Sequence, residues 1–222
     1  MLSLFVMDVS GSTKFDNSDE ISRHLIQLTQ EIAHWTQSVN FKYINFRMGD
    51  ELFFVSDSLC ATLFTSYYIK LLWPFKKQPI KFGIAVSDDD IPTGNLEHWN
   101  AAIIKQARRN LDEIKHSEVS DFYITMDDER TILMNNVLFP YLSEIIYQLS
   151  PMQRQVILLS FVYEQQKEIA QLLNKSVSTV SEHLKKGHKK QLSAIEAAMS
   201  DIDDTFDFSP FIKTIFKESA LC

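Results

Sequence analysis

The sequence predicts an α+β protein: a ferredoxin-like antiparallel sheet domain in residues 1–128, followed by an all-α helix-turn-helix domain in residues 150–199. Two observations predict this fold class. Short apolar strands and amphipathic helices follow one another in the order β-α-β-β-α-β-α-β over the first 126 residues. After residue 150 the apolar residues keep only helical spacing. A connecting helix over 129–149 and an acidic, then amphipathic, tail over 200–222 complete the expected organisation.

The elements of the first domain follow from their apolar spacing and their turn residues. The predicted strands are Leu2–Val9, Phe41–Arg47, Leu52–Val55, Ile80–Val86 and Phe122–Met126. The predicted helices are 20–39, 59–73, 97–114 and a connecting helix over 130–149 that bends near Pro140. Gly49 and Asp50 form the tip of a hairpin, because glycine can take a positive φ there. We expect the helices to cover one face of the sheet.

Residues 151–186 have the spacing of a helix-turn-helix. The buried faces of the two short helices are predicted to be Ile169, Leu172 and Leu173 on the first, and Val177, Val180 and Leu184 on the second. Ala170 is small where the two helices must cross closely. Asn174 lies at the turn and tolerates a left-handed backbone, and Ser176 or Ser178 can cap the second helix. Such a unit places its second helix in the DNA major groove, and the alternative is a helical hairpin that binds nothing.

The charge distribution supports DNA binding by this unit. The chain as a whole carries 22 basic and 29 acidic residues, but residues 151–199 have a net charge of +3. Lysines neutralise phosphates, whereas short polar side chains on the second helix reach base edges. Lys189 and Lys190 extend the basic run. The candidate DNA-binding residues are Gln166, Lys175, Ser176, Ser178, Thr179, Ser181, Glu182, His183, Lys185 and Lys186.

The composition and the cysteine content predict a cytoplasmic protein. The chain has 222 residues, 45% of them hydrophobic, and its apolar runs are far shorter than the roughly 20 residues of a membrane span. The first residues lack a basic leader, so we do not expect them to be a signal peptide. Cys60 and Cys222 do not make a disulfide framework, so reducing conditions are expected.

Two carboxylates in the first domain form a candidate metal pair. Asp8 ends the first strand and Asp50 lies at the hairpin tip, and in a ferredoxin-like sheet these two places can be neighbours. The backbone amides of Ser10, Gly11, Ser12 and Thr13 could then hold phosphate oxygens, with Mg²⁺ as the cation. The alternative is that both aspartates only stabilise turns.

Two segments, Phe5–Thr13 and Phe46–Phe54, resemble the two metal-site motifs of class III nucleotide cyclase homology domains, and Ile80–Ile84 resembles the strand that follows them in that family. The combination with a C-terminal helix-turn-helix similar to sigma region 4 resembles the SatD family of small bacterial proteins, over roughly residues 1–195. That family has a Gly-Asp hairpin and a helix with an Ala-Arg pair, here Ala107-Arg108. The resemblance implies a ferredoxin-like fold, metal binding by Asp8 and Asp50, and phosphate contact by Arg108.

The departures from working cyclases put catalysis in doubt. Phe46 stands where the cyclases have a purine-selecting lysine. Their Asn-x-x-x-Arg motif has no match, because Ile104 follows four residues after Asn100 and the arginines come at Arg108 and Arg109. Donors aimed at developing charge are therefore missing from the family's places.

The predicted function is a DNA-binding transcription regulator with a catalytically degenerate sensor or dimerisation domain. The alternatives are a metal-dependent enzyme acting on a nucleoside triphosphate, and a sigma-like module that contacts RNA polymerase. We expect a homodimer, because a single helix-turn-helix binds DNA with modest affinity. The tail residues expected to pack on the body or on the partner are Phe211, Ile212, Ile215 and Phe216.

Overall fold

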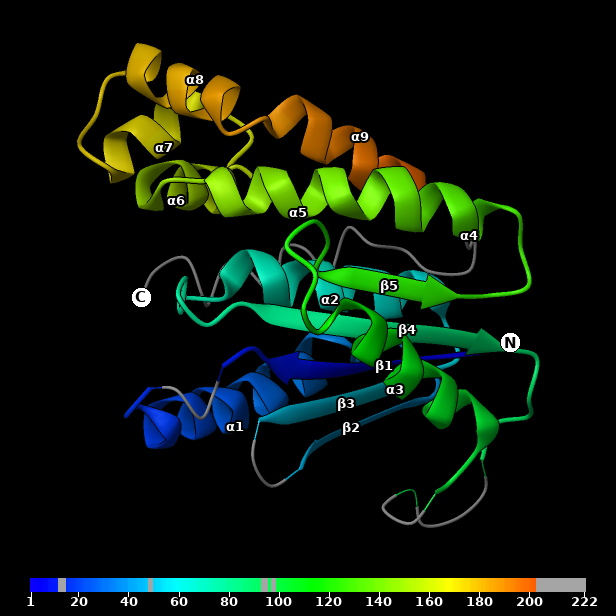
Figure 1. The fold of residues 1–222 in the computed structure, drawn as a ribbon. Helices are drawn as coiled ribbons and strands as arrows, with labels where there is room; N and C mark the ends of the chain where they lie inside the picture. Colours follow the sequence, from blue (N-terminus) through cyan, green and yellow to red (C-terminus); the bar gives the residue numbers. More distant parts are fainter. Residues whose placement is uncertain (12–14, 48–49, 93–95, 97–98, 203–222) are drawn as a thin grey trace. The chain divides into compact units, whose positions relative to one another are not determined.

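The computed structural model describes residues 1–11, 15–47, 50–92, 96 and 99–202. The chain forms two compact units, Met1–Glu144 and Ile145–Cys222, which divide within a helix that runs through both (Figure 1). The mixed α+β character of the first unit and the helical character of the second confirm the expected fold class at this level. Within the described ranges, every helix is too short or too polar to cross a membrane.

The first unit contains a five-stranded sheet with the order β2-β3-β1-β4-β5. Its strands are β1 (Leu2–Val9), β2 (Lys42–Arg47), β3 (Glu51–Ser56), β4 (Ile80–Ser87) and β5 (Phe122–Thr125). The first three neighbouring pairs are antiparallel, whereas β4 and β5 are parallel. The prediction of an antiparallel sheet is therefore wrong at the β5 edge. The helix between β4 and β5 carries the chain back, so that β5 starts from the same end of the sheet as β4.

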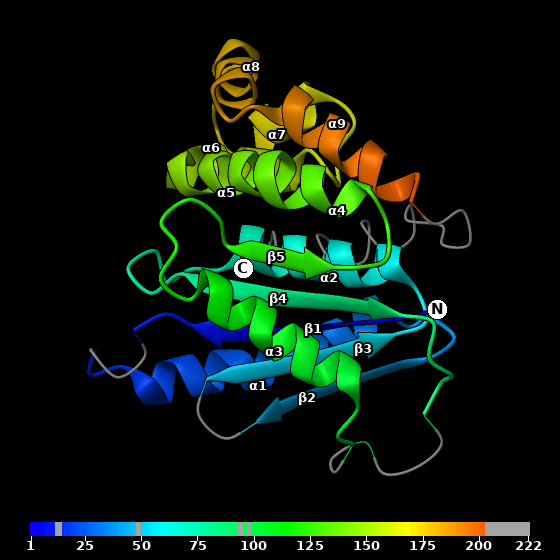
Figure 2. The same cartoon turned by 45° about the vertical axis from the view of Figure 1, so that its right-hand side comes forward.

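Helices cover both faces of this sheet. Figure 2 shows α3 (Ala102–Ile114) in front of the strands, with α1 (Ser18–Trp35) and α2 (Leu59–Leu72) behind them. Leu4 and Val6 of β1 pack against the α3 side, whereas Ser3 points the other way and bonds Thr62 of α2. The expectation that all helices lie on one face is wrong, because successive side chains of β1 are buried on opposite faces and each face needs cover.

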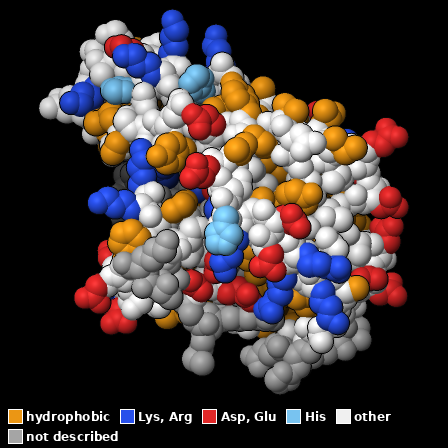
Figure 3. Space-filling view, in the orientation of Figure 1, with side chains coloured by type: hydrophobic (Ala, Val, Ile, Leu, Met, Phe, Trp, Pro, Cys, Tyr) orange, Lys and Arg blue, Asp and Glu red, His pale blue; other side chains and the backbone are white. Residues whose placement is uncertain are grey.

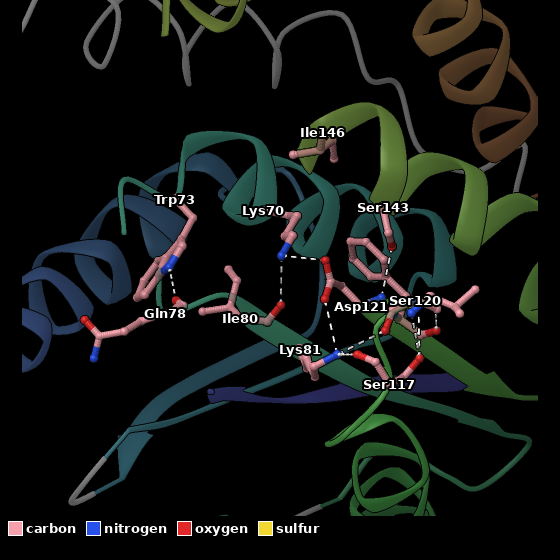
Figure 4. A network of polar contacts seen from close by, with 12 residues as sticks. Lys70, Trp73, Gln78, Ile80, Lys81, Ser117, Ser120, Asp121, Ser143 and Ile146 are labelled. Carbon is pink, nitrogen blue, oxygen red and sulfur yellow. Dashed lines mark hydrogen bonds and ion pairs between the residues drawn. The ribbon is translucent and has the colours of Figure 1, made fainter. Parts of the chain in front are cut away.

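Two buried lysines and one aspartate join α2, β4 and the segment before β5 (Figure 4). Lys70 Nζ lies 2.7 Å from Asp121 Oδ2, and Lys81 Nζ lies 3.4 Å from Asp121 Oδ1. Each ammonium also donates to a carbonyl, Lys70 to that of Ile80 and Lys81 to that of Ser117. Buried charges are tolerated only when paired and hydrogen-bonded in this way. The cluster therefore fixes the edge at which β5 joins the sheet.

The chain leaves the sheet through one long helix that contains a π turn. It consists of α4 (Arg130–Leu133), the π-helical η3 (Met134–Leu138) and α5 (Phe139–Gln148). The sequence predicts a bend near Pro140, and the structure has a π turn that ends at Leu138, two residues before the proline. Proline lacks an N–H and its ring crowds the carbonyl four residues earlier, so a wider turn relieves the conflict.

The second unit is entirely helical in its described part. It contains the C-terminal end of α5, then α6 (Pro151–Leu159), α7 (Gln166–Leu172), α8 (Val177–Lys186) and α9 (Lys189–Ser200). Ser150 and Gln153 form a capping box at the start of α6. The core of α6, α7 and α8 is built from Val156, Leu159, Ile169, Ala170 and Val180. The predicted tail contacts of Phe211, Ile212, Ile215 and Phe216 lie outside the described residues.

Candidate functional site

Helices α7 and α8 form a helix-turn-helix whose turn matches the predicted chemistry. Asn174 has φ 51°, the left-handed conformation expected at this turn. The Lys175 amide donates to the Ala170 carbonyl at 2.9 Å, which closes the end of α7. Ser176 then caps α8, because its hydroxyl accepts the Thr179 amide at 3.1 Å. The turn and cap therefore set the direction in which α8 leaves α7.

The apolar faces of α7 and α8 are narrower than predicted. Ile169 and Val180 are almost fully buried, and Leu184 packs partly against the same core. The prediction that Leu172 and Val177 are buried is wrong, since they are 46% and 47% exposed. Leu172 is the last residue of α7 and Val177 the first of α8, and the core contacts of α8 come from Val180 onward. Both side chains therefore lie on the surface beside the turn.

The candidate DNA-binding side chains lie mostly on the surface of this unit. Thr179 and His183 are half-buried, whereas the exposed residues are Gln166, Lys175, Ser176, Ser178, Ser181, Glu182, Lys185 and Lys186. Figure 3 shows blue side chains over the part of the molecule that contains α8. The exposed face of α8 thus combines hydroxyls, a carboxylate and ammonium groups.

Three of the predicted groups have roles within the fold. The Ser176 hydroxyl is the cap of α8 and contacts the Ser178 hydroxyl at 2.8 Å. Glu182 binds Lys186 at 2.7 Å, an exposed pair one turn apart that water and salt weaken. Lys189, which was predicted to extend the phosphate-binding lysines, has partners within the fold instead. It is mostly buried, 3.9 Å from the centre of the Phe161 ring and 3.4 Å from Glu196 Oε2.

In the first unit the structure brings Asp8 and Asp50 together. Asp8 is the last residue but one of β1, Asp50 precedes β3, and the two strands are antiparallel neighbours, so the end of one meets the start of the other. Burial, followed by the negative charge of Asp50 and a side-chain hydrogen bond to it, raises the pKa of Asp8 from 3.8 to about 6. The negative charge of Asp50 therefore disfavours the ionised form of the half-buried Asp8. The two adjacent carboxyl groups are able to share a cation.

Cationic side chains of the α3 segment flank this pair. Lys115 Nζ lies 3.7 Å from Asp8 Oδ2, and Arg108 binds Glu51 Oε1 at 2.8 Å. The sequence analysis did not identify Lys115 or Glu51, although Glu51 directly follows Asp50 and Lys115 is the C-cap residue of α3. Arg108, predicted to contact phosphate, has this carboxylate as its partner. Within the described ranges, no three His, Cys, Asp or Glu side chains converge on one metal position.

Of the predicted phosphate cradle, residues 10–13, the structure describes Ser10 and Gly11. The Ser10 amide donates to the Pro79 carbonyl at 2.8 Å, so this N–H is already used, contrary to the prediction. Gly11 has φ 71°, a left-handed conformation that glycine adopts without strain. Ser12 and Thr13, like Gly49 of the hairpin, lie outside the described residues. Gly11 is therefore the one described residue of the four whose amide remains a candidate.

Comparison with known protein families gives a match in the second unit. Residues 145–190 match the family model of Sigma-70, region 4. No curated protein and no solved structure matches the chain significantly. The matched range contains the end of α5 and all of α6, α7 and α8, so the second unit contains a sigma-70 region 4 domain. The match indicates a transcription-related helix-turn-helix of the DNA-binding kind in these helices.

Proposed function

We propose that this protein is a cytoplasmic transcription regulator that binds double-stranded DNA through α8. The observation that carries the proposal is the exposed polar face of α8, in a helix-turn-helix whose core and cap are made by other residues. The match to sigma-70 region 4 over the same helices supports it. A helix held in this way can enter the major groove with its N-terminal residues toward the bases.

The exposed side chains divide by chemistry into two groups. Ser178, Ser181 and Glu182 can donate to or accept from base edges, and Glu182 suits the amino group of cytosine. Glu182 would exchange Lys186 for the base at little cost, because their ion pair is exposed. Lys175 and Lys185 are exposed cations that suit phosphate oxygens. The first group would supply sequence discrimination and the second affinity.

Salt-dependent duplex binding tests this assignment. Replacing Lys185 and Lys186 by Ala should weaken binding to every sequence and lower the slope of log K against log salt by about 0.9 for each phosphate that is no longer neutralised. The matched control replaces Lys76 and Lys77, a second adjacent pair of exposed lysines, which lies in the sheet unit. Fluorescence anisotropy at several salt concentrations measures both. Absence of duplex binding even at low salt would refute the proposal and favour the alternative, a sigma-like contact with RNA polymerase.

For the first unit we propose a ferredoxin-like domain of the class III cyclase type that has lost efficient catalysis. The strand order β2-β3-β1-β4 with antiparallel neighbours supports the ferredoxin-like assignment. The resemblance of Phe5–Thr13 and Phe46–Phe54 to cyclase motifs supports the second part, and Phe46 and Ile104 argue against turnover. The domain would then sense a phosphate-bearing ligand or hold two copies together.

The carboxyl pair fits a divalent cation in its donor chemistry. Mg²⁺ in proteins takes one or two carboxylates together with water and ligand phosphates, and Asp8 and Asp50 supply two that are already adjacent. A bound cation would supply positive charge for phosphate oxygens. Of this chain's own residues, the ionised form of Asp8 would bind the cation, and Lys115 and Arg108 would stay at the rim.

Incubation with ATP or GTP and Mg²⁺ or Mn²⁺ separates the sensor from the enzyme. We expect the cation to raise the melting temperature of the wild type and leave that of Asp50→Ala unchanged, with no cyclic product formed by either. Cyclic product from the wild type that disappears in Asp50→Ala would establish the enzyme instead. If neither cation nor nucleotide changes the melting temperature, the domain is a structural, dimerising one.

A further inference from the structure

The long helix that leaves the sheet exposes an apolar face. Four large side chains on α4, η3 and α5 are 46% to 66% exposed: Ile132, Leu133, Val137 and Tyr141. Figure 3 shows hydrophobic side chains on the surface of the region that contains this helix. Scattered apolar side chains are common on protein surfaces, but these four follow one another along a single helix.

The opposite side of the same helix is already used by the sheet unit. Phe139 packs on Phe122 of β5, with 5.4 Å between the ring centres. The Asn135 side chain bonds the backbone of Ile124 in both directions, at 2.9 and 2.8 Å. Met134 and Leu142 are buried. The helix is therefore apolar on two sides, and a helix of that kind is normally covered on both.

The charges of this segment indicate what covers the outer face. From Thr131 to Ser143 the chain contains no Asp, Glu, Lys or Arg, although its net charge is −7. DNA and anionic membrane surfaces attract cationic faces, so a face without Lys or Arg fits neither. Two copies of an acidic chain repel each other where the acidic surface of one faces that of the other. Along this neutral stretch of the helix that repulsion is absent.

The spacing of the side chains suits a helix of the same kind. Leu133, Val137 and Tyr141 are each four residues apart and form one ridge along the helix. The π turn between Leu133 and Tyr141 has wider i→i+5 bonding, so side chains four residues apart lie nearly in line along this helix. A two-fold axis through the middle of the ridge makes the face complementary to itself.

We propose that two copies of the protein associate through this outer face, with Leu133, Val137 and Tyr141 of each copy packed against those of the other. Val137, at the centre of the ridge, lies next to the two-fold axis. This dimer does not depend on DNA binding. Where the DNA proposal also holds, the dimer carries two recognition helices, which is the arrangement that half-site operators require.

Sedimentation velocity of the full chain at tens of micromolar tests the interface. We expect a dimer for the wild type and a monomer for Val137→Glu, because the substitution brings two carboxylates together at the axis. The matched control is Ile26→Glu, a half-exposed isoleucine on the surface of α1, which should remain a dimer. Circular dichroism should show the same helical content in all three, since both substituted positions are exposed.

Disulfide trapping gives an independent readout. In a Cys222→Ser background, Val137→Cys should form a covalent dimer under mild oxidation, and the buried Cys60 should not interfere. A monomeric wild type would overturn the proposal, and so would a dimer that persists in Val137→Glu. Failure of the Val137→Cys variant to cross-link would also overturn it, because another part of the same chain, such as residues 203–222, would then cover this face.

Discussion

The two units of this protein hold their candidate functional side chains in opposite ways. On α8 the core, turn and cap are made by Val180, Asn174 and Ser176, which leaves Ser181 and Lys185 exposed on the surface. In the sheet unit the candidate side chains bind one another in pairs that are less exposed than the Glu182–Lys186 pair of α8. Asp8 meets Asp50 and Lys115, and Glu51 meets Arg108. The helical surface is therefore ready for an external partner, whereas the sheet site must exchange internal partners for a ligand.

This difference determines how each site responds to substitution. Changes on the exposed face of α8 should alter binding and leave folding nearly unchanged. Changes in the sheet site should alter stability and its pH dependence even without ligand, because each charged group is part of an internal pair. The predictions below test that contrast, from the largest expected effect to the smallest.

The largest effect is expected from crowding the sheet unit at Gly83. An added Cβ would overlap the Ala107 carbonyl oxygen and the Leu111 nitrogen, both backbone atoms of α3. Gly83→Ala should therefore lower the free energy of unfolding by about 3 kcal/mol or more. In the helical unit, a Cβ at Gly187 would lie 2.7 Å from the end of the Ile157 side chain and 3.0 Å from the His183 carbonyl oxygen, a milder overlap than at Gly83. Gly187→Ala should cost about 1 kcal/mol.

Urea unfolding followed by circular dichroism measures both variants. Equal losses would show that α3 can move away from β4 as easily as a side chain can turn, which contradicts the close packing of the sheet unit. In Gly83→Ala, the folded fraction should still bind duplex DNA as the wild type does.

A smaller effect is expected from the Asp8 carboxyl. Its pKa in the folded protein is about 6 against an ordinary value of 3.8, so the fold favours the protonated form. Protonated Asp8 therefore makes its full contribution to the stability of the fold below about pH 4, and this contribution is lost as the pH rises through 6. Asp8→Asn should remove this loss and raise the free energy of unfolding at pH 7 by at most about 3 kcal/mol.

Denaturation at a series of pH values checks the direction. The wild type should lose stability relative to Asp8→Asn between about pH 4 and pH 7. A wild type that is instead stabilised relative to the variant as the pH rises would mean that the charge of Lys115 outweighs both the burial of Asp8 and the charge of Asp50. Mg²⁺ should narrow the difference at pH 7, because a bound cation favours the ionised carboxyl.

The smallest effect is expected at the rim of the carboxyl pair. Arg108 and Glu51 are 2.8 Å apart, but the arginine side chain is 47% exposed. Exposed ion pairs contribute roughly 0.2–1 kcal/mol, so Arg108→Ala should change stability by about 0.5 kcal/mol. Thermal unfolding with and without a nucleotide separates this from a ligand contact. A loss of the nucleotide-induced shift without a change in basal stability would assign Arg108 to phosphate binding.

The helical site is the easier one to predict from sequence, because its determinants are local. The left-handed turn at Asn174 and the cap at Ser176 lie within three residues of each other and follow from their own side chains. The prediction for Leu172 and Val177 is wrong because helical spacing does not say where a short helix stops touching its neighbours. The prediction for Lys189 is wrong because its partner Glu196 lies two turns further along α9, the helix that Lys189 begins.

The sheet site depends on contacts that sequence spacing does not report. The element order could be predicted, yet the parallel direction of β5 and the cover on both faces depend on which strands become neighbours. The adjacency of Asp8 and Asp50 was expected from a ferredoxin-like order. The buried Lys70 and Lys81 were not expected, since lysine is rarely buried and Asp121 lies far along the chain.

The central claim is that α8 reads bases. Its most direct test compares binding to a duplex selected for tight binding to this protein with binding to a scrambled duplex of the same composition. For Ser178→Ala with Ser181→Ala, binding to the selected duplex should weaken by about 1–3 kcal/mol for each base that is no longer hydrogen-bonded, while binding to the scrambled duplex stays unchanged. Ser193→Ala, an exposed serine on α9, should match the wild type on both. Equal weakening on both duplexes, or none on either, would contradict base reading by α8.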